Sequence, residues 1–368
     1  MSRRRVTPHG LVLLLVAAIW SASAFAGAAP AGVPKGPADD PPVTLRLGFF
    51  TRSLATLAAQ TNGFYAEESL AVAEFPVSGS RQAFQFLRDG LYDIVLASAD
   101  NPVNFRLNPH NALGAPLDVR VFMGGDYGMS LTLVAQPGIT RVEDLRGKTL
   151  AVDAPDSGFA FALYAMMRRH GLERDVDYAV ISAGGTPARF AALLAGQFDA
   201  TLLNSGFELR AALAGRVLLD SVASVARPYL GQVFSAMVPW LAAHEDVVVR
   251  FIRAYVRAVR WALDPSNREV AITLLMTQPN TSRALAEQIY ALQVTDGIGL
   301  IPEARIDRSG LYNVLALRAE FDGFEARENL RLLSTPAGGL FALSFYRAAR
   351  RDLHRSGEDM ENGQDQDQ

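Results

Sequence analysis

The sequence predicts an α/β protein built from two similar lobes. From Val43 to Ser98 the pattern alternates as strand, helix, strand, helix, strand, which is the order of a parallel α/β unit. The same order returns about a hundred residues later, between Lys148 and Asn204. From about Pro239 onwards the periodicity becomes helical. We therefore expect two sheets flanked by helices, followed by a helical C-terminal region.

Each predicted lobe contains three strands and the helices between them. Alternating apolar and polar residues identify the strands, and Ser53 is placed to cap the first helix. In the first lobe we predict strands from Val43, at 71–75 and at 90–98, and helices at 53–60 and from the turn at 78–80 to Asp89. In the second lobe we predict strands at 148–152, 178–182 and 196–204, and helices at 157–170 and after the turn at 184–186.

A short motif marks the same place in both lobes. Residues 90–93 read Gly-Leu-Tyr-Asp and residues 196–199 read Gly-Gln-Phe-Asp, and each Asp lies fifteen residues after the start of its lobe's turn. We expect each glycine to end a helix in the left-handed conformation, because glycine adopts positive φ without steric cost. Aspartate commonly caps such strand entries. Asp93 and Asp199 are therefore not counted among the site residues.

Helices fill the remainder of the predicted fold. Residues 244–263 place apolar side chains on one face and arginines 250, 253, 257 and 260 on the other, which predicts one buried and one solvated face. Further helices are predicted at 267–276, 282–293, 302–320 and 340–355. We expect these helices to pack on the first lobe (43–125 and 239–355). The second lobe is placed at 126–238, with hinge strands at 125–131 and 231–238.

Both ends of the chain have the composition of segments outside the fold. Residues 1–26 combine three arginines, an apolar stretch and a small-residue site at 24–26, which predicts a cleaved signal peptide. Residues 27–42 are rich in Pro, Ala and Gly, and residues 356–368 are polar and acidic, so we expect a flexible leader and a disordered tail. The chain has no cysteine and thus no lipid attachment site or disulfide. We expect a free periplasmic protein.

Composition and charge exclude several kinds of partner. Hydrophobic residues make up 49% of the 368 residues, which is enough for a core without disulfides. The 35 Lys and Arg are outnumbered by 38 Asp and Glu, so we expect neither nucleic acid nor an anionic membrane as a partner.

The histidines beyond the signal peptide, at 110, 170, 244 and 354, lack metal-ligand spacing, and no phosphate-binding loop or nucleophile elbow occurs. We expect a monomer without metal or cofactor.

Four segments resemble one family of transport proteins. They are Asn62–Leu70, Gly90–Val95, Gly138–Val152 and Phe251–Pro265, and they are similar to the aliphatic sulfonate, nitrate and thiamine-precursor binding proteins of ABC importers. The resemblance runs over most of residues 43–335. It implies a type II periplasmic-binding-protein fold and a ligand held between the lobes. It also implies delivery to the permease and ATPase subunits in the inner membrane.

The absence of cysteine and the predicted export signal argue against enzymes of the same fold. Enzymes that make the thiamine pyrimidine resemble this fold but carry a cysteine-rich motif, which a chain without cysteine lacks. Menaquinone-pathway enzymes and receptors that feed a sensor kinase remain alternatives, although an export signal argues against cytosolic biosynthesis. We therefore expect a solute-binding receptor and no enzymatic activity.

The ligand is expected at the carboxyl ends of the strands, because open parallel sheets bind ligands in the crevice there. In the first lobe the predicted contact residues are Phe50, Thr51, Arg52, Ser53, Ser78, Gly79, Ser80, Ser98 and Asp100. In the second lobe and the first hinge they are Asp153, Asp156, Ser157, Gly158, Gly184, Gly185, Thr186, Asn204 and Tyr127. Each serine is equally suited to cap a helix.

The predicted site gives opposing indications of ligand charge. Arg52 and the helix beginning near Ser157, whose free N–H groups favour anions, suggest a sulfonate or carboxylate. Asp153 and Asp156 depart from the uncharged loop of many relatives and suggest amine or ring N–H donors, such as those of an aminopyrimidine. Asp156 is also placed to cap the helix. We expect a small organic anion, with a nitrogen heterocycle as the second candidate.

Overall fold

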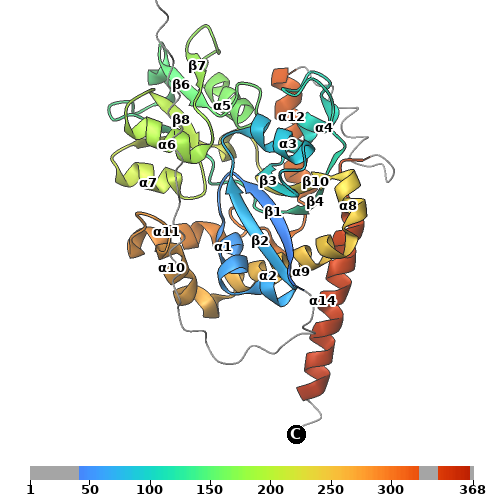
Figure 1. Ribbon diagram of the computed structural model, residues 1–368. Helices are drawn as coiled ribbons and strands as arrows, with labels where there is room; N and C mark the ends of the chain where they lie inside the picture. Colours follow the sequence, from blue (N-terminus) through green and yellow to red (C-terminus); the bar gives the residue numbers. More distant parts are fainter. Residues whose placement is uncertain (1–40, 323–338, 365–368) are drawn as a thin grey trace, which may run out of the picture. The chain divides into compact units, whose positions relative to one another are not determined.

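A mixed five-stranded sheet forms the first lobe of the computed structural model, which describes residues 41–322 and 339–364, with side chains to residue 355. Its elements are β1 (Val43–Phe49), α1 (Leu54–Thr61), α2 (Phe64–Glu67), β2 (Leu70–Pro76), α3 (Ser80–Arg88), β3 (Ile94–Ser98), α4 (Asp100–Leu107), β4 (Val119–Gly124) and β10 (Gln232–Met237). The strand order is β2-β1-β3-β10-β4 (Figure 1). β1 runs parallel to β2 and β3, and β10 runs antiparallel to β3 and β4.

A second five-stranded sheet forms the second lobe. Its elements are β5 (Thr132–Ala135), η1 (Val142–Leu145), β6 (Thr149–Val152), α5 (Gly158–Arg169), β7 (Ala179–Ser182), α6 (Thr186–Leu194), β8 (Ala200–Leu203), α7 (Phe207–Leu213), β9 (Val217–Ser221) and η2 (Val222–Ser224). The strand order is β7-β6-β8-β5-β9, with β6 parallel to β7 and β8 and with β5 antiparallel to β8 and β9.

The two sheets share one topology, which confirms the predicted internal repeat. Asp93, just before β3, accepts a hydrogen bond from the backbone N–H of Arg46 in β1 at 2.8 Å. Asp199, just before β8, accepts one from the N–H of Thr149 in β6 at 2.9 Å. The glycines of both motifs have positive φ, as predicted. Each aspartate therefore fixes the entry of its strand into the sheet and has a structural role.

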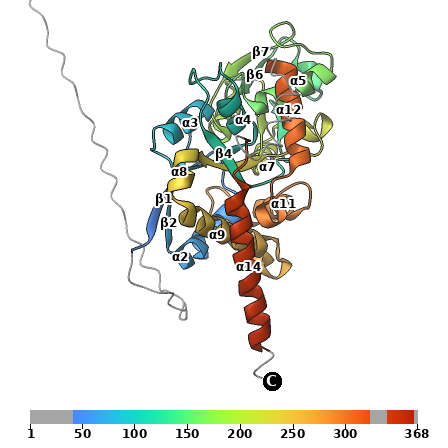
Figure 2. The same cartoon turned by 90° about the vertical axis from the view of Figure 1, so that its right-hand side faces the viewer.

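The C-terminal helices pack mainly on the first lobe, as predicted. They are α8 (Val238–Ala243), α9 (Glu245–Leu263), η3 (Pro265–Asn267), α10 (Arg268–Met276), α11 (Arg283–Val294), η4 (Pro302–Ala304), α12 (Arg308–Asp322) and α14 (Leu343–Gln364). α9 contacts α1, α2 and α14, and α10 contacts α1. Figure 2 shows α9 beside α2 and α14. α12 contacts both α4 and α5, and α11 contacts α7, so this region also touches the second lobe.

Two predictions concern the ends of the described chain. We expected the last helix to end at residue 355, but α14 continues to Gln364. Glu and Met, which favour helix, occur in this added stretch. The predicted signal peptide, residues 27–40 of the predicted leader and residues 365–368 lie outside the described residues. Among the described helices, none has both the length and the apolar character of a membrane span.

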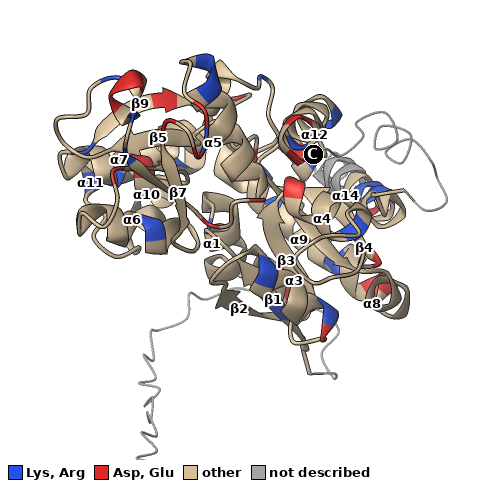
Figure 3. Ribbon diagram, turned by 90° about the horizontal axis from the view of Figure 1, so that it is seen from above, with Lys and Arg blue, Asp and Glu red and all other residues tan. Residues whose placement is uncertain are grey.

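The arginines on one face of α9 form ion pairs with neighbouring elements. Arg253 and Arg257 both bind Glu68 at the end of α2, with N···O distances of 2.6 and 3.1 Å. Arg253 also reaches Asp352 of α14, and Arg260 binds Glu303 of η4. Charged residues of both signs are spread over both lobes (Figure 3). The predicted solvated face is therefore a set of ion pairs that joins α9 to its neighbours.

The second crossing between the lobes differs from the prediction. We expected residues 231–238 to end the second lobe as a hinge strand, but β10 lies between β3 and β4 in the first sheet. Val233 and Phe234 are buried there, on opposite faces of the strand. Because a strand buried on both faces is stabilised inside a sheet, the chain crosses between the lobes before Gln232.

The two crossing segments touch at a pair of glycines. A Cβ atom on Gly231 would lie 2.5 Å from the Cα of Gly128 and would overlap the carboxylate of Asp126. The Gly128 atoms belong to the backbone of the first crossing segment, so they cannot move aside as a flexible side chain would. The close approach therefore requires glycine at position 231.

We predict that Gly231→Ser lowers the free energy of unfolding by roughly 1–3 kcal/mol, because the added side chain forces the crossing segments apart. Gly79→Ser is the matched control: Gly79 has an extended backbone with open space around it, and serine is a favourable N-cap. Urea denaturation followed by circular dichroism measures both variants. Equal stability of the two would contradict the close approach.

Candidate functional site

Residues from both lobes line a cavity at the carboxyl ends of the parallel strands. This arginine cavity contains about 400 Å³ of space not filled by atoms. The loops after β1, β3, β6 and β8 and the first turns of α5 and α6 contribute most of its lining. The lining residues are Phe50, Thr51, Ser98, Asn101, Asp153, Ser157, Gly158, Phe159, Thr186, Arg189, Asn204 and Gln232. Among the residues predicted from sequence, the structure brings together Phe50, Thr51, Ser98, Asp153, Ser157, Gly158, Thr186 and Asn204.

Arg189 is the one cation that lines this cavity among the described residues, and the sequence analysis missed it. Its side chain lies in α6 and is 1% exposed. It donates to the backbone oxygens of Gly184 (2.5 Å) and Leu202 (3.1 Å) and to the hydroxyl of Thr186 (3.3 Å). Its Nε has no hydrogen-bond partner within the described residues. Burial lowers the pKa of Arg189, and the charge of Asp153 opposes that shift.

Asp153 supplies a negative charge to the same cavity. Its carboxylate accepts a hydrogen bond from the hydroxyl of Ser157 at 2.6 Å, and Ser157 in turn accepts from the N–H of Ala160 as the N-cap of α5. Burial raises the pKa of Asp153, while Arg189 lowers it. The cavity thus combines the buried cation of Arg189 with the half-buried carboxylate of Asp153, which is already bonded to the start of a helix.

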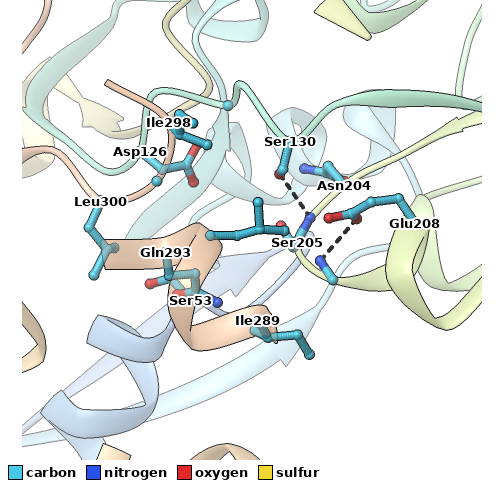
Figure 4. Close-up of a pocket in the computed structure, with 14 residues that line it drawn as sticks. Ser53, Asp126, Ser130, Asn204, Ser205, Glu208, Ile289, Gln293, Ile298 and Leu300 are labelled. Atoms are coloured by element: carbon cyan, nitrogen blue, oxygen red, sulfur yellow. Dashed lines mark hydrogen bonds between the residues drawn. The ribbon is translucent and has the colours of Figure 1, made fainter. Parts of the chain in front are cut away.

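A second cavity adjoins the first and is negatively charged. This carboxylate cavity contains about 450 Å³ of empty space (Figure 4). Its lining residues are Ser53, Asp126, Gly128, Ser130, Asn204, Ser205, Gly206, Glu208, Ile289, Leu292, Gln293, Ile298, Gly299 and Leu300. Asn204 lines both cavities. Of the predicted residues, only Ser53 and Asn204 occur in this lining.

Two carboxylates, the buried Glu208 and the half-buried Asp126, give the second cavity its charge. Glu208 is 3% exposed, and its Oε2 accepts from the N–H of Gly206 at 3.0 Å. Burial raises the pKa of Glu208 to about 7. Asp126 accepts from the amide side chain of Gln232 at 2.9 Å, and burial raises its pKa as well. Neither carboxylate has a distinctive sequence pattern, because each sits outside the repeated strand-end loops.

Several predicted residues line neither cavity. Arg52 binds Glu74 at 2.8 Å and stacks over Phe49, so its charge is already matched on the neighbouring strand. Asp100 is fully buried and bonded to Arg318, which also binds the backbone oxygen of Asp156. Asp156 does not cap α5, since Ser157 does. The others outside both linings are Ser78, Gly79, Ser80, Tyr127, Gly184 and Gly185.

Some of these residues join the lobes instead. The N–H of Gly185 donates to the backbone oxygen of Ser78 at 3.1 Å, so the turns that the repeat predicted meet each other. The hydroxyls of Thr51 and Ser205 also lie 3.0 Å apart across the lobes. The structure therefore has the strand-end loops of both lobes in direct contact beside the cavities.

The lining residues are suited to polar recognition of a small molecule. They provide a guanidinium, carboxylates, amides and hydroxyls, together with the rings of Phe50 and Phe159. Within residues 41–322 and 339–355, no group of His, Asp or Glu side chains is arranged to hold a metal ion.

Comparison with known proteins identifies the family. The NMT1/THI5-like family model matches residues 51–268, which is more than half of the chain. The chain therefore belongs to the NMT1/THI5-like family. No curated protein matches it.

Solved structures share the fold at low sequence identity. A protein from Bordetella bronchiseptica is 19% identical, with a TM-score of 0.68, over 84% of this chain and 98% of that one. The alkanesulfonate-binding protein SsuA from Xanthomonas axonopodis pv. citri is 21% identical, with a TM-score of 0.61, over 79% and 95%. The periplasmic nitrate-binding protein NrtA from Synechocystis is 13% identical, with a TM-score of 0.60, over 87% and 89%. The predicted type II periplasmic-binding-protein fold is confirmed.

We predict that Glu208 makes stability fall as pH rises. Its carboxyl keeps a proton up to about pH 7 in the folded protein, whereas the ordinary value is 4.5, so the folded state binds more protons between these values. From pH 5 to pH 8 the free energy of unfolding of the native protein should decrease. This decrease should exceed that of Glu208→Gln by on the order of 3 kcal/mol. Urea denaturation at both pH values measures this difference.

The control for this pH series is Glu245→Gln, which changes an exposed carboxyl at the start of α9. Its pH profile should run parallel to that of the native protein. A Glu208→Gln profile that is also parallel would show that burial does not raise the pKa of Glu208.

Proposed function

We propose that this member of the NMT1/THI5-like family is the extracytoplasmic solute-binding receptor of an ABC importer, and that it binds a small organic anion in the arginine cavity. Arg189 carries this proposal. Its guanidinium is buried and lines the cavity, and its hydrogen bonds within the described residues go only to uncharged oxygen atoms. A buried cation is costly to desolvate unless an anion or further acceptors reach it.

Uncharged donors near Arg189 support the same ligand class. The hydroxyl of Thr186 donates to Oδ1 of Asn204 at 2.8 Å, so Nδ2 is the group through which the Asn204 side chain can donate. The first turn of α5 contributes Gly158 and Phe159 to the lining. The positive end of a helix dipole stabilises a nearby negative group.

The similar structures agree with a small anion. Of the neighbours, the Xanthomonas protein is an alkanesulfonate-binding protein and the Synechocystis protein binds nitrate. The rings of Phe50 and Phe159 in the lining add apolar surface, which suits an organic tail better than a purely inorganic ion. An alkylsulfonate or carboxylate is therefore the favoured ligand.

A nitrogen heterocycle, such as a pyrimidine-type thiamine precursor, is the second candidate. Oε1 of Gln232 is buried in the same lining and has no hydrogen-bond partner within the described residues. Together with Asp153 it would accept hydrogen bonds from ring N–H or amino groups. This ligand ranks second because Asp153 already accepts a hydrogen bond from Ser157, whereas Arg189 has no anionic hydrogen-bond partner.

We also propose delivery of the solute to a membrane permease, in preference to signalling through a kinase or to catalysis. The predicted signal peptide at residues 1–26 would export the protein to the compartment where such receptors act. The periplasmic nitrate-binding neighbour supports this location. Solute uptake by vesicles that contain the permease and ATPase distinguishes transport from signalling.

We predict that small organic anions raise the melting temperature and that Arg189→Gln abolishes most of this response. Loss of a charge-assisted hydrogen bond of about 1.5–3 kcal/mol weakens binding by roughly 10- to 100-fold. Thermal-shift assays with alkanesulfonates, carboxylates and aminopyrimidines measure the response, because a specific ligand stabilises the folded state by mass action.

Arg52→Ala is the matched control, since Arg52 is paired with Glu74 away from the cavity. It should respond to anions as the native protein does. Thr51→Val serves as a second site variant if Arg189→Gln does not fold. Stabilisation by aminopyrimidines alone, retained in Arg189→Gln, would contradict the anion and favour the second candidate.

We predict that the lobes close on the ligand. The contacts Gly185–Ser78 and Thr51–Ser205 join the lobes beside the cavities, so separation of the lobes would widen the path by which a ligand enters. Small-angle X-ray scattering should show a smaller radius of gyration at ligand saturation than without ligand. Arg189→Gln under the same conditions should show no compaction. An unchanged radius in the saturated native protein would contradict closure.

A further inference from the structure

The carboxylate cavity contains an unsatisfied acceptor that the proposed anion site does not use. Oε1 of Glu208 is buried and has no hydrogen-bond partner within the described residues. Its other oxygen, Oε2, caps the backbone N–H of Gly206 at the start of α7. Capping explains the position of Oε2 but leaves Oε1 without a role. Buried polar atoms in native proteins are nearly always paired, so Oε1 indicates a missing donor.

The surroundings of Glu208 indicate what kind of donor is missing. Asp126 contributes a second carboxylate, and the polar remainder of the lining includes the hydroxyls of Ser53, Ser130 and Ser205 (Figure 4). No Lys, Arg or His lines this cavity among the described residues. A cavity with two carboxylates and several hydroxyl acceptors is matched by an ammonium group, which carries three donors and a positive charge.

The two cavities share a lining residue. Asn204 lines both, so it forms part of the wall between them. Gln232 lines the arginine cavity and donates to Asp126, which lines the carboxylate cavity. A single molecule that passes Asn204 therefore meets a guanidinium at one end and carboxylates at the other.

We infer that the ligand is a small organic anion that also carries an amino group, and that Glu208 binds this amino group. The inference rests on the proposed function for the anionic end, which Arg189 binds. It adds the recognition of a positive charge at the opposite end. A simple anion fills only the arginine cavity and leaves Oε1 of Glu208 unpaired.

This inference can be tested with pairs of compounds on the protein without its predicted signal peptide, residues 1–26. We choose ω-aminoalkanesulfonates with chains of about two to four carbons, each compared with the alkanesulfonate of the same length, so that only the amino group differs. Isothermal titration calorimetry should show at least about tenfold tighter binding of one amino compound than of its partner, as expected for a charge-assisted hydrogen bond. Glu208→Gln should remove this advantage, so that the two members of a pair bind to this variant with affinities that agree within about twofold.

The control variant is Glu245→Gln, which should retain the preference for the amino compound. Equal binding of both members of every pair by the native protein would overturn the role of Glu208 while leaving the anion site intact. This comparison does not depend on any variant, so it decides the matter even if Glu208→Gln fails to fold. If no member of any pair binds, the anion site itself is wrong, and the inference falls with it.

Discussion

A buried arginine holds the site-forming parts of both lobes together. Arg318 in α12 is fully buried, and it binds both oxygens of Asp100 in the first lobe at 2.6 Å and the backbone oxygen of Asp156 in the second lobe at 2.9 Å. Gly158 packs so closely on Asp100 that a side chain there would overlap it. Bidentate geometry and further hydrogen bonds are what make such a buried ion pair tolerable. The start of α5, which lines the arginine cavity, is therefore positioned by this pair.

The parts of the fold that the sequence predicts well are those set by local patterns. Alternating residues mark strands, and the repeated Gly-x-aromatic-Asp motif marks equivalent strand entries, so three strands of each sheet and the helices between them were predicted, whereas β4, β5 and β9 were not. The position of β10 and the contact of α12 with both lobes were not predicted. They depend on pairing with segments distant in the chain, and no local pattern in residues 232–237 or 308–322 shows which sheet or helix will be the partner.

Some residues of the candidate site could likewise be predicted from the sequence, and others could not. Thr51, Ser157 and Asn204 follow strands or begin helices at the carboxyl edge of a sheet, so topology alone predicted that they meet. Arg189 and Glu208 lie within helices, where a charged residue is usually expected on the solvent side. The repeat did contain a signal for Arg189: the equivalent position in the first lobe is Ala83, which is fully buried. The repeat thus places a charged residue opposite a small apolar one, which distinguishes Arg189 from its counterpart in the first lobe.

The charged groups of the site are divided between the two cavities. Arg189 and Asp153 line one cavity, Glu208 and Asp126 line the next, and Asn204 lines both. Burial lowers the pKa of the arginine and raises the pKa of each carboxyl, so desolvation works against the charged form at both ends. A ligand with opposite charges at its two ends would stabilise the charged forms of the arginine and of the carboxyl groups. The lobe closure that we propose would remove water from both cavities and strengthen these interactions, because the local dielectric would fall.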